Sequence, residues 1–311
     1  MWLRGGLQGG GHAEDCALDC FASLAMTGVG ERVRRGFDQR CLAKKLAKWR
    51  GYRQRRVSPF LLLCARYFRK SPLSSEPALA PDLAVVLLSG GMDSMVCAAL
   101  AREAGYRVIA LTVDYNQRHR CELEAAARVV AAIGAQEHLV APLDLRSFGG
   151  SALTSDADVP KDGAGANGGE GIPITYVPAR NTIFLSLALG LAEARGAKHI
   201  YVGVNALDYS GYPDCRPAFV TAFEAMANLA TKAGVEGDPF LFETPLLHMS
   251  KADIAREAHR LGLDAGISWT CYDPSDDGLH CGECDACRLR AKGFAEAGLP
   301  DPTVYAVEPQ C

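Results

Sequence analysis

From residue 83 onward, short apolar runs alternate with helical stretches. The apolar runs, each typical of a strand buried on both faces of a sheet, cover 83–88, 107–113, 138–140 and 198–204. One helical stretch between these runs ends at residue 104, and two others cover 122–133 and 181–195. Strands and helices that alternate with short connections predict an α/β fold with a doubly wound parallel sheet.

The first eighty residues lack this alternation. A glycine-rich start leads into a basic, partly helical run over 31–56, and the prolines and serines of 71–81 are typical of a linker. We therefore predict an N-terminal extension over 1–80 and one α/β domain over 81–311. Five of the twelve residues over 160–171 are glycine, which predicts a mobile loop, and a candidate lid, inside that domain.

The formal net charge of −3 is the sum of two unlike parts. Residues 1–80 carry 15 Lys and Arg against 6 Asp and Glu, whereas residues 81–311 carry 18 against 30. The basic arm fits either contact with nucleic acid or a loosely ordered extension, and the lack of an aromatic or base-reading pattern favours the extension. The acidic balance of the domain argues against a nucleic-acid partner.

Composition narrows the class of protein. Apolar residues make up 49% of the chain and charged residues 22%, which excludes a wholly disordered chain. The apolar run over 60–65 is far shorter than the roughly 20 residues that span a bilayer, and the N-terminus lacks the layout of a secretory signal. We therefore expect a cytoplasmic protein with no membrane partner, in which clustered cysteines indicate metal ligands or catalytic groups before disulfides.

The segment from Ser89 to Ser94, Ser-Gly-Gly-Met-Asp-Ser, follows the first predicted strand and leads into a helix. Ligands of parallel sheets collect at the carboxyl ends of strands. Paired glycines let the backbone approach a ligand closely, and free amides at a helix N-terminus favour an anion. Asp93 is expected to cap the helix. A plain turn between a strand and a helix has a similar composition, so the turn alone leaves both interpretations open.

Two absences narrow the interpretation of this hexad. It has no lysine where a Walker A loop requires one, and its glycine spacing does not fit a dinucleotide fingerprint. The hexad resembles the pyrophosphate loop of the ATP pyrophosphatase (PP-loop) superfamily, whose members cleave ATP between the α- and β-phosphates and adenylate a substrate. The ATP-binding residues implied by this resemblance are Leu88, Ser89, Gly90, Gly91, Met92, Asp93, Ser94, Met95, Val96, Cys97 and Ala98. Cys97 is also expected to be a small core residue.

Four of the 12 cysteines form the pattern C-x9-C-x2-C-x2-C, at Cys271, Cys281, Cys284 and Cys287. Gaps of two residues let successive thiolates converge on one ion, and a fourth thiolate from a nearby loop completes a tetrahedron. The spacing leaves zinc and an iron–sulfur cluster open. A zinc ion with four protein ligands has no open position, so we expect a structural ion over 271–287 that holds the C-terminal loops near the active site.

Further motifs join the hexad and the cysteines into one order along the chain. They are 114–119 (DYNQRH), 151–154 (SALT), 176–181 (YVPARN), 210–216 (SGYPDCR), 244–246 (TPL) and Lys251 at the start of a helix. This order resembles the 7-cyano-7-deazaguanine synthase family, from about residue 83 to about 298. The glycine-rich insert near 164–169 departs from the family pattern and puts only the loop length in doubt.

The resemblance implies an adenine nucleotide alpha hydrolase-like fold and a ligase. Its substrates would be ATP, ammonia and 7-carboxy-7-deazaguanine, with magnesium beside ATP and one structural zinc ion. Adenylation would replace the oxide leaving group of the carboxylate with AMP, ammonia would give the amide, and a second adenylation would allow dehydration to the nitrile. A homodimer is left open.

The resemblance also implies roles for individual residues. The catalytic residues would be Asp93, Ser94, Asp114, Arg180 and Lys251. Arg180 and Lys251 would neutralise phosphate charge or the substrate carboxylate, and Asp114 would receive adenosine or steer magnesium. The polar edge of the deazaguanine would be read by Tyr212, Asp214 and Arg216. Taken singly, strand ends, helix caps and turns explain these residues equally well.

Two rival functions would also use some of these motifs. Another PP-loop enzyme, such as a tRNA thiolase or a lysidine-type ligase, would share the hexad and the adenylation step but act on RNA. A zinc-ribbon module that grips nucleic acid would use the cysteines and the basic arm, and would leave the strand–hexad–helix unit without a purpose. Bound iron would favour a cluster-dependent thiolase, and bound zinc would favour the synthase.

Overall fold

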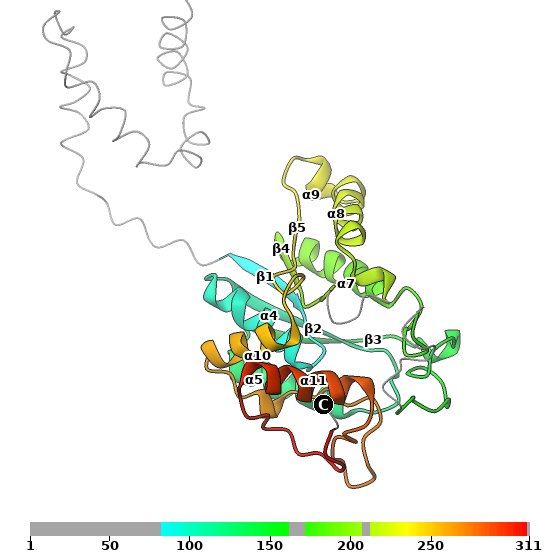
Figure 1. Ribbon diagram of the computed structural model, residues 1–311. Coiled ribbons are helices and arrows are strands. Elements are labelled where there is room, and N and C mark those ends of the chain that lie inside the picture. The colour runs from blue at the N-terminus through cyan, green and yellow to red at the C-terminus, as the bar shows by residue number, and fades with distance from the viewer. Residues whose placement is uncertain (1–81, 162–171, 207–211, 310–311) are drawn as a thin grey trace, which may run out of the picture. The chain divides into compact units, whose positions relative to one another are not determined.

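The computed structural model describes residues 82–161, 172–206 and 212–309 (Figure 1). The predicted extension over 1–80, and the predicted glycine loop from residue 162 on, lie outside the described residues. Within the described part, five parallel strands form one sheet in the order β3-β2-β1-β4-β5. The prediction of a doubly wound parallel α/β fold is confirmed.

The elements alternate along the chain as the apolar pattern predicts. The strands are β1 (Leu83–Leu87), β2 (Arg107–Asp114), β3 (Glu137–Pro142), β4 (His199–Val202) and β5 (Leu241–Glu243). The α-helices are α4 (Met92–Glu103), α5 (Cys121–Ile133), α7 (Arg180–Arg195), α8 (Pro217–Ala230), α9 (Lys232–Val235), α10 (Lys251–Arg260) and α11 (Asp285–Ala297). Short 3-10 turns cover Arg146–Phe148, Pro213–Cys215 and Ala265–Ile267. None of the described helices is long and apolar enough to cross a membrane.

Strand β1 is the centre of the sheet because both of its faces are apolar. Val85 pairs in register with Ile109 of β2 on one side and with Ile200 of β4 on the other. Ala84 and Val86 pack against the layer of α4, α5, α10 and α11, whereas Val85 packs against α7 and α8 (Figure 1). The sheet therefore lies between two helical layers, and side chains that alternate along β1 fill both cores.

The boundaries differ from the apolar pattern at the edges of the sheet. Strand β3 extends two residues beyond the predicted 138–140 at its C-terminal end. It is an edge strand on which Leu139 and Val140 are exposed, so its apolar pattern does not mark its full length. The pattern misses β5, which has only three residues, and also α8, which exposes Met226 and Leu229. Helix α4 begins at Met92, so the second half of the hexad is its first turn.

The strand order places one functional position at the middle of the sheet. From β1 the chain continues outward through β2 and β3, and it later returns to the other side of β1 for β4 and β5. The connections that leave β1 and β4 therefore diverge from adjacent carboxyl ends, which is where ligands bind in open α/β sheets. The hexad occupies the loop after β1.

Candidate active site

The hexad forms a compact loop held by its own serines. Ser94 Oγ donates to the carbonyl of Gly91 at 2.9 Å and accepts from the amide of Ser89 at 3.2 Å. The amide of Gly91 donates to Ser89 Oγ at 3.3 Å. These bonds fix the turn that leads into α4, whose first amides face the site.

Gly90 is required by its position in this loop. Its φ is +88°, in the left-handed region, and a Cβ there would lie 2.4 Å from the carbonyl oxygen of Glu122 and 2.7 Å from the amide nitrogen of Ala126. Only a glycine lets the loop approach α5 this closely. The carbonyl of Gly90 also accepts from the amide of Trp269 at 2.9 Å, which joins the loop to the C-terminal segment.

Lys251 reaches the loop from the first position of α10. Its Nζ lies 2.9 Å from Oδ1 and 2.8 Å from Oδ2 of Asp93. Asp93 therefore does not cap α4 as expected: Gly91 is the N-cap and forms no side-chain cap bond. Both side chains of the ion pair are partly exposed, at 16% for Lys251 and 24% for Asp93, so they face the site rather than the core.

A cavity of about 320 Å³ opens beside the loop. It is lined by nine of the residues predicted to bind ATP or substrate or to act in catalysis: Leu88, Ser89, Gly91, Met92, Asp93, Ser94, Arg180, Tyr212 and Lys251. These come from the loop after β1, from α4, α7 and α10, and from the turn before α8, so the fold brings together residues more than 150 positions apart. A pocket of this size fits a small molecule.

The other predicted site residues lie outside the cavity wall. Gly90 packs on α5, and Met95, Val96, Cys97 and Ala98 are fully buried in the core of α4, as expected for Cys97. Burial raises the pKa of the Cys97 thiol.

Asp114, Asp214 and Arg216 also line no part of the cavity. Asp114 ends β2 and pairs with Arg120 at 3.2 Å. Asp214 is buried, and its carboxylate accepts from the amide of Asn181 at 3.0 Å, which satisfies a free donor in the first turn of α7. Arg216 is exposed at the N-cap of α8.

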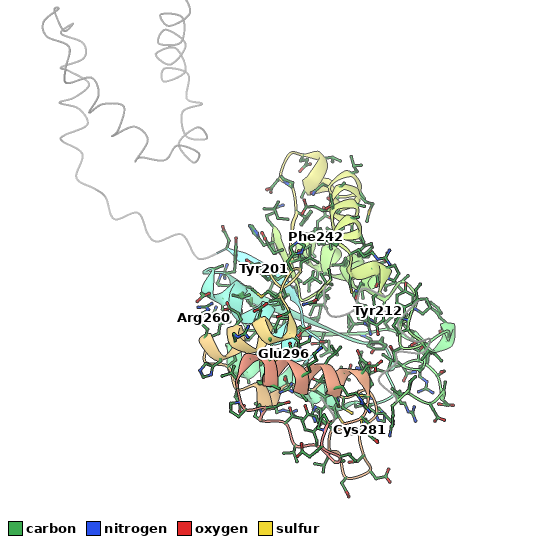
Figure 2. The ribbon with its side chains drawn as sticks, in the orientation of Figure 1. Tyr201, Tyr212, Phe242, Arg260, Cys281 and Glu296 are labelled. Atoms are coloured by element: carbon green, nitrogen blue, oxygen red, sulfur yellow. The ribbon has the colours of Figure 1, made fainter. Side chains whose placement is uncertain are left out.

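Arg180 supplies a positive charge in the cavity wall. The residue before it, Ala179, has a φ of +54°, and this left-handed turn starts α7 so that Arg180 is its first residue. Burial alone opposes the charge of Arg180, but the nearby hydroxyls of Tyr115, Tyr212 and Tyr272, together with Glu122, raise its pKa. Figure 2 shows Tyr212 on the side of the molecule where α7 begins. The guanidinium therefore stays charged and can bind an anion.

Glu122 is a cavity residue that the motifs did not single out. It lies in the first turn of α5 and lines the cavity with Arg180. Burial raises the pKa of Glu122 to about 7, against the opposing charge of Arg180. In the sequence Glu122 belongs to an alanine-rich amphipathic helix and looks like a surface residue, so only the approach of other segments could reveal it.

The four predicted metal ligands do converge. The sulfur atoms of Cys271, Cys281, Cys284 and Cys287 all lie within 4.8 Å of one another, and all four residues are buried. A tetrahedral zinc site with Zn–S distances near 2.3 Å has sulfur–sulfur edges of about 3.8 Å. The measured separation of Cys281 Sγ and Cys287 Sγ is 4.0 Å. The four thiols thus fit one tetrahedral ion.

Backbone amides complete the surroundings of the sulfurs. Cys271 Sγ accepts from the amides of Cys281 at 3.2 Å and Asp273 at 3.4 Å, and Cys281 Sγ accepts from the amides of Cys284 at 3.3 Å and Glu283 at 3.4 Å. Hydrogen bonds from the neighbouring thiols lower the pKa of Cys281. These donors stabilise thiolates, the form that binds a metal.

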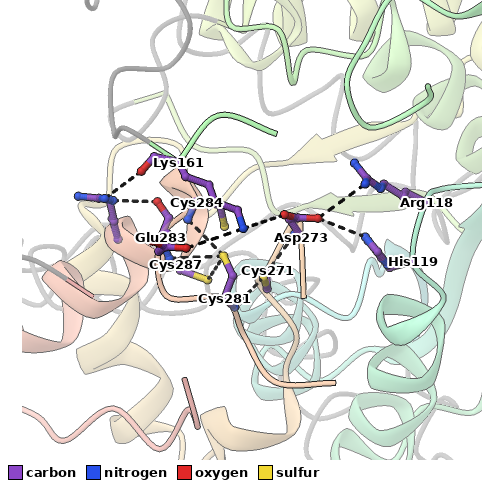
Figure 3. A network of polar contacts seen from close by, with 10 residues as sticks. Arg118, His119, Lys161, Cys271, Asp273, Cys281, Glu283, Cys284 and Cys287 are labelled. Atoms are coloured by element: carbon purple, nitrogen blue, oxygen red, sulfur yellow. Dashed lines mark hydrogen bonds and ion pairs between the residues drawn. The ribbon is translucent and has the colours of Figure 1, made fainter. Parts of the chain in front are cut away.

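A charged network surrounds the cysteine loops. Figure 3 shows Asp273 facing Arg118, His119 and Lys161. Its carboxylate lies 3.1 Å from Lys161 Nζ and 3.9 Å from both Arg118 and His119. These contacts tie the segment after β2 and the segment before the glycine loop to the cysteines.

Arg290 of α11 holds the segment between the cysteines and the cavity. It is 1% exposed, and it bonds to Asp301 at 3.1 Å, Ser268 Oγ at 2.9 Å and Thr270 Oγ1 at 3.2 Å. The ring of Trp269 packs on His280, with ring centroids 4.1 Å apart. The amide of Trp269 also donates to the carbonyl of Gly90, so Trp269 connects the cysteine loops to the hexad loop.

The chain is similar to known proteins over more than two thirds of its length. The family described as "Queuosine biosynthesis protein QueC" matches residues 83–298. The 7-cyano-7-deazaguanine synthase 1 of Sphingopyxis alaskensis is 70% identical over 222 residues, 71% of this chain and 97% of that protein. The 7-cyano-7-deazaguanine synthase of Xanthomonas oryzae pv. oryzae is 64% identical over 224 residues, 72% of this chain and 98% of that protein. Among solved structures, a 4-thiouridine synthetase–RNA complex with bound ATP has a TM-score of 0.40 and 19% identity, covering 72% of this chain and 47% of that one.

The matched range begins with β1 and contains the hexad, Arg180, Lys251 and the four cysteines. The matched range ends just after α11 and therefore includes every residue of the cavity wall. The resemblance drawn from the order of motifs is confirmed, and the chain belongs to the QueC family of queuosine biosynthesis proteins.

Proposed function

We propose that this chain is an ATP-dependent ligase that converts 7-carboxy-7-deazaguanine and ammonia into 7-cyano-7-deazaguanine. Membership of the family and relatives of that name at 64% and 70% identity support this function. The observation that carries it is the shared cavity, in which the hexad, the Lys251–Asp93 pair and the Arg180 guanidinium face the same space. Such a space suits a nucleotide beside a small anionic substrate.

The chemistry begins with a carboxylate, which is a poor electrophile because its leaving group would be oxide. Attack of this carboxylate on the α-phosphorus of ATP forms an acyl adenylate and releases pyrophosphate. The loop from Ser89 to Ser94 and the first amides of α4 hold the pyrophosphate, and Lys251 neutralises its charge. Catalysis of this step consists mainly of positioning and charge neutralisation.

Arg180 holds the carboxylate that is activated. Its planar guanidinium matches a carboxylate with two parallel hydrogen bonds. Tyr212 and Tyr272 lie in the same wall and offer flat faces to a bicyclic base. Asp214 and Arg216 lie outside this wall, so of the three proposed substrate residues Tyr212 retains the role.

Ammonia then attacks the acyl adenylate to give the amide. The amide oxygen attacks a second ATP, and loss of AMP with two protons from nitrogen gives the nitrile. AMP rather than ADP is therefore the nucleotide product of both steps.

The four cysteines would hold one structural zinc ion, which when bound crosslinks the loops before α11 to the first turn of that helix. Its effect on the site passes through Trp269, whose amide binds Gly90. Magnesium would arrive with ATP and coordinate mainly phosphate oxygens, with Asp93, one of the two carboxylates in the cavity wall, beside it. Asp114 lines no part of the cavity and is a weaker candidate for that role.

The experiment incubates the purified chain with 7-carboxy-7-deazaguanine, ammonium and magnesium-ATP. Mass spectrometry is expected to show the nitrile, with two AMP for each nitrile formed. ADP without AMP, or no nitrile, would overturn the proposal. Thiolated or ligated tRNA, formed with tRNA in place of the deazaguanine, would favour the rival class of PP-loop enzymes.

A further inference from the structure

Glu122 lines the cavity beside the charge of Arg180. It lines the wall from the first turn of α5, and no other described residue hydrogen-bonds to its carboxylate. The backbone of the same residue lies against Gly90 of the hexad loop, since a Cβ placed at Gly90 would be 2.4 Å from the carbonyl oxygen of Glu122. Glu122 is thus next to the loop that would bind the phosphates.

Charged and titratable groups face Glu122 from two directions. Arg180 approaches from α7, and Tyr115 approaches from the segment after β2. His119 lies just before α5, and the Lys251–Asp93 pair lines the same cavity. Asp93 is the other carboxylate in the cavity wall, and it is held by Lys251 at 2.8 Å. Glu122 is therefore the carboxylate there that is available to exchange a proton.

The proposed reaction requires a proton acceptor at this place. Ammonia carries three hydrogens, and the nitrogen of the amide keeps two. As the N–C bond forms and the C–O bond to AMP breaks, one proton must leave the nitrogen. A base beside the reacting carbon prevents the nitrogen from leaving again as ammonia.

We propose that Glu122 is the general base of ammonia transfer, an inference that rests on the proposed function. The Glu122 carboxylate takes the proton from the attacking nitrogen while AMP departs with the C–O electron pair. The products are the amide, AMP and a neutral Glu122 carboxyl, so atoms and charge balance. The carboxyl then releases its proton to water. Its raised pKa, about 7, suits a group that accepts and returns a proton near neutral pH.

The test separates adenylation from ammonia transfer in the full-length protein. Exchange of labelled pyrophosphate into ATP, dependent on 7-carboxy-7-deazaguanine, reports adenylation and needs no ammonia. Single-turnover formation of the amide reports ammonia transfer, measured from pH 5.5 to 8.5 at a constant concentration of unprotonated ammonia. The variants are Glu122→Gln, Glu122→Asp and, as matched control, Glu124→Gln, an exposed carboxylate of the same helix turn.

Glu122→Gln is expected to keep pyrophosphate exchange within about threefold and to slow amide formation about 100- to 10,000-fold. In the wild type the rate of amide formation rises through a pH of about 7, because the carboxylate is the active form and is populated as pH increases. Glu122→Gln loses this rise, Glu122→Asp keeps it at a lower rate, and Glu124→Gln matches the wild type.

Two results would overturn the inference. Equal losses of exchange and amide formation in Glu122→Gln would assign the residue a structural role. A pH rise that persists in Glu122→Gln would place the base elsewhere. Wild-type protein without pyrophosphate exchange would instead overturn the proposed function itself, so the two failures are distinguishable.

Discussion

The ammonium group of Lys251 lies 2.8 and 2.9 Å from the two carboxylate oxygens of Asp93, and so links the first turns of α10 and α4. The pair sits in the cavity wall and remains partly exposed. Lys251 therefore orients the first turn of α4, which ends the hexad loop. It also supplies a positive charge where phosphates would lie.

Replacement of this lysine tests that double role. Lys251→Met is expected to reduce substrate-dependent pyrophosphate exchange about 100- to 1,000-fold, because one preorganised charge is lost from the phosphate site. The control is Lys292→Met, which removes an exposed lysine paired with Glu296 at 3.7 Å and should leave exchange unchanged. Full exchange in Lys251→Met would show that the lysine serves stability alone.

A comparison of Gly90 and Gly105 separates the effect of backbone strain from the effect of a steric collision with a neighbouring helix. Gly90 and Gly105 have φ values of +88° and +94°, but nothing lies within 4 Å of a Cβ placed at Gly105. Gly105→Ala is expected to cost about 1 kcal/mol of folding free energy. Gly90→Ala carries the same strain and also collides with the backbone of α5, so it should lower the melting temperature further and reduce pyrophosphate exchange at least tenfold. Equal effects of the two variants on melting and exchange would contradict the close approach.

The cysteine cluster predicts a stoichiometric metal. The purified protein should contain about one zinc per chain, and Cys284→Ser should lose it, because three thiolates and a hydroxyl hold zinc poorly. We expect a fall in melting temperature together with weaker nucleotide binding, since the amide of Trp269 joins these loops to Gly90. Cys121→Ser is the matched control, because Cys121 lies outside the cluster. Iron instead of zinc in elemental analysis would contradict this prediction.

The proposed domain boundary also has a direct test. The family match begins at residue 83, and the relatives cover about 72% of the chain. A chain that starts at Pro81 is therefore expected to keep its metal content and to form the nitrile at the full-length rate. A folded but inactive truncation, judged by circular dichroism, would show that the N-terminal residues take part in turnover.

The apolar pattern predicts the buried strands well and the edges poorly. Strands β1 and β2 are apolar along nearly their whole length because both faces are covered. Strand β3 is half-exposed, and β5 has three residues, so neither has a complete apolar signature. The sequence pattern therefore identifies an element when its environment is uniform along the strand.

The candidate site could be predicted where local chemistry marks it. The spacing of the cysteines is typical of a metal site, and the hexad and Lys251 gain meaning from their order along the chain with the other motifs. Glu122 has no such mark, because its surroundings in the structure include Gly90 and Arg180, which are distant in sequence. Asp214 shows the opposite case: its motif suggests substrate binding, whereas its carboxylate satisfies an amide at the start of α7.

The strand order has a consequence for synthesis of the chain. β1 pairs with β4, and Val85 must wait for Ile200, which is made 115 residues later. At ribosomal rates this delay is on the order of ten seconds. During that time β1, β2 and β3 can pair, but the backbone N–H and C=O groups on the β4 side of β1 are left unpaired. The nascent chain therefore passes through a window in which its central strand is open to aggregation or to a chaperone, and the window closes only when β4 leaves the ribosome.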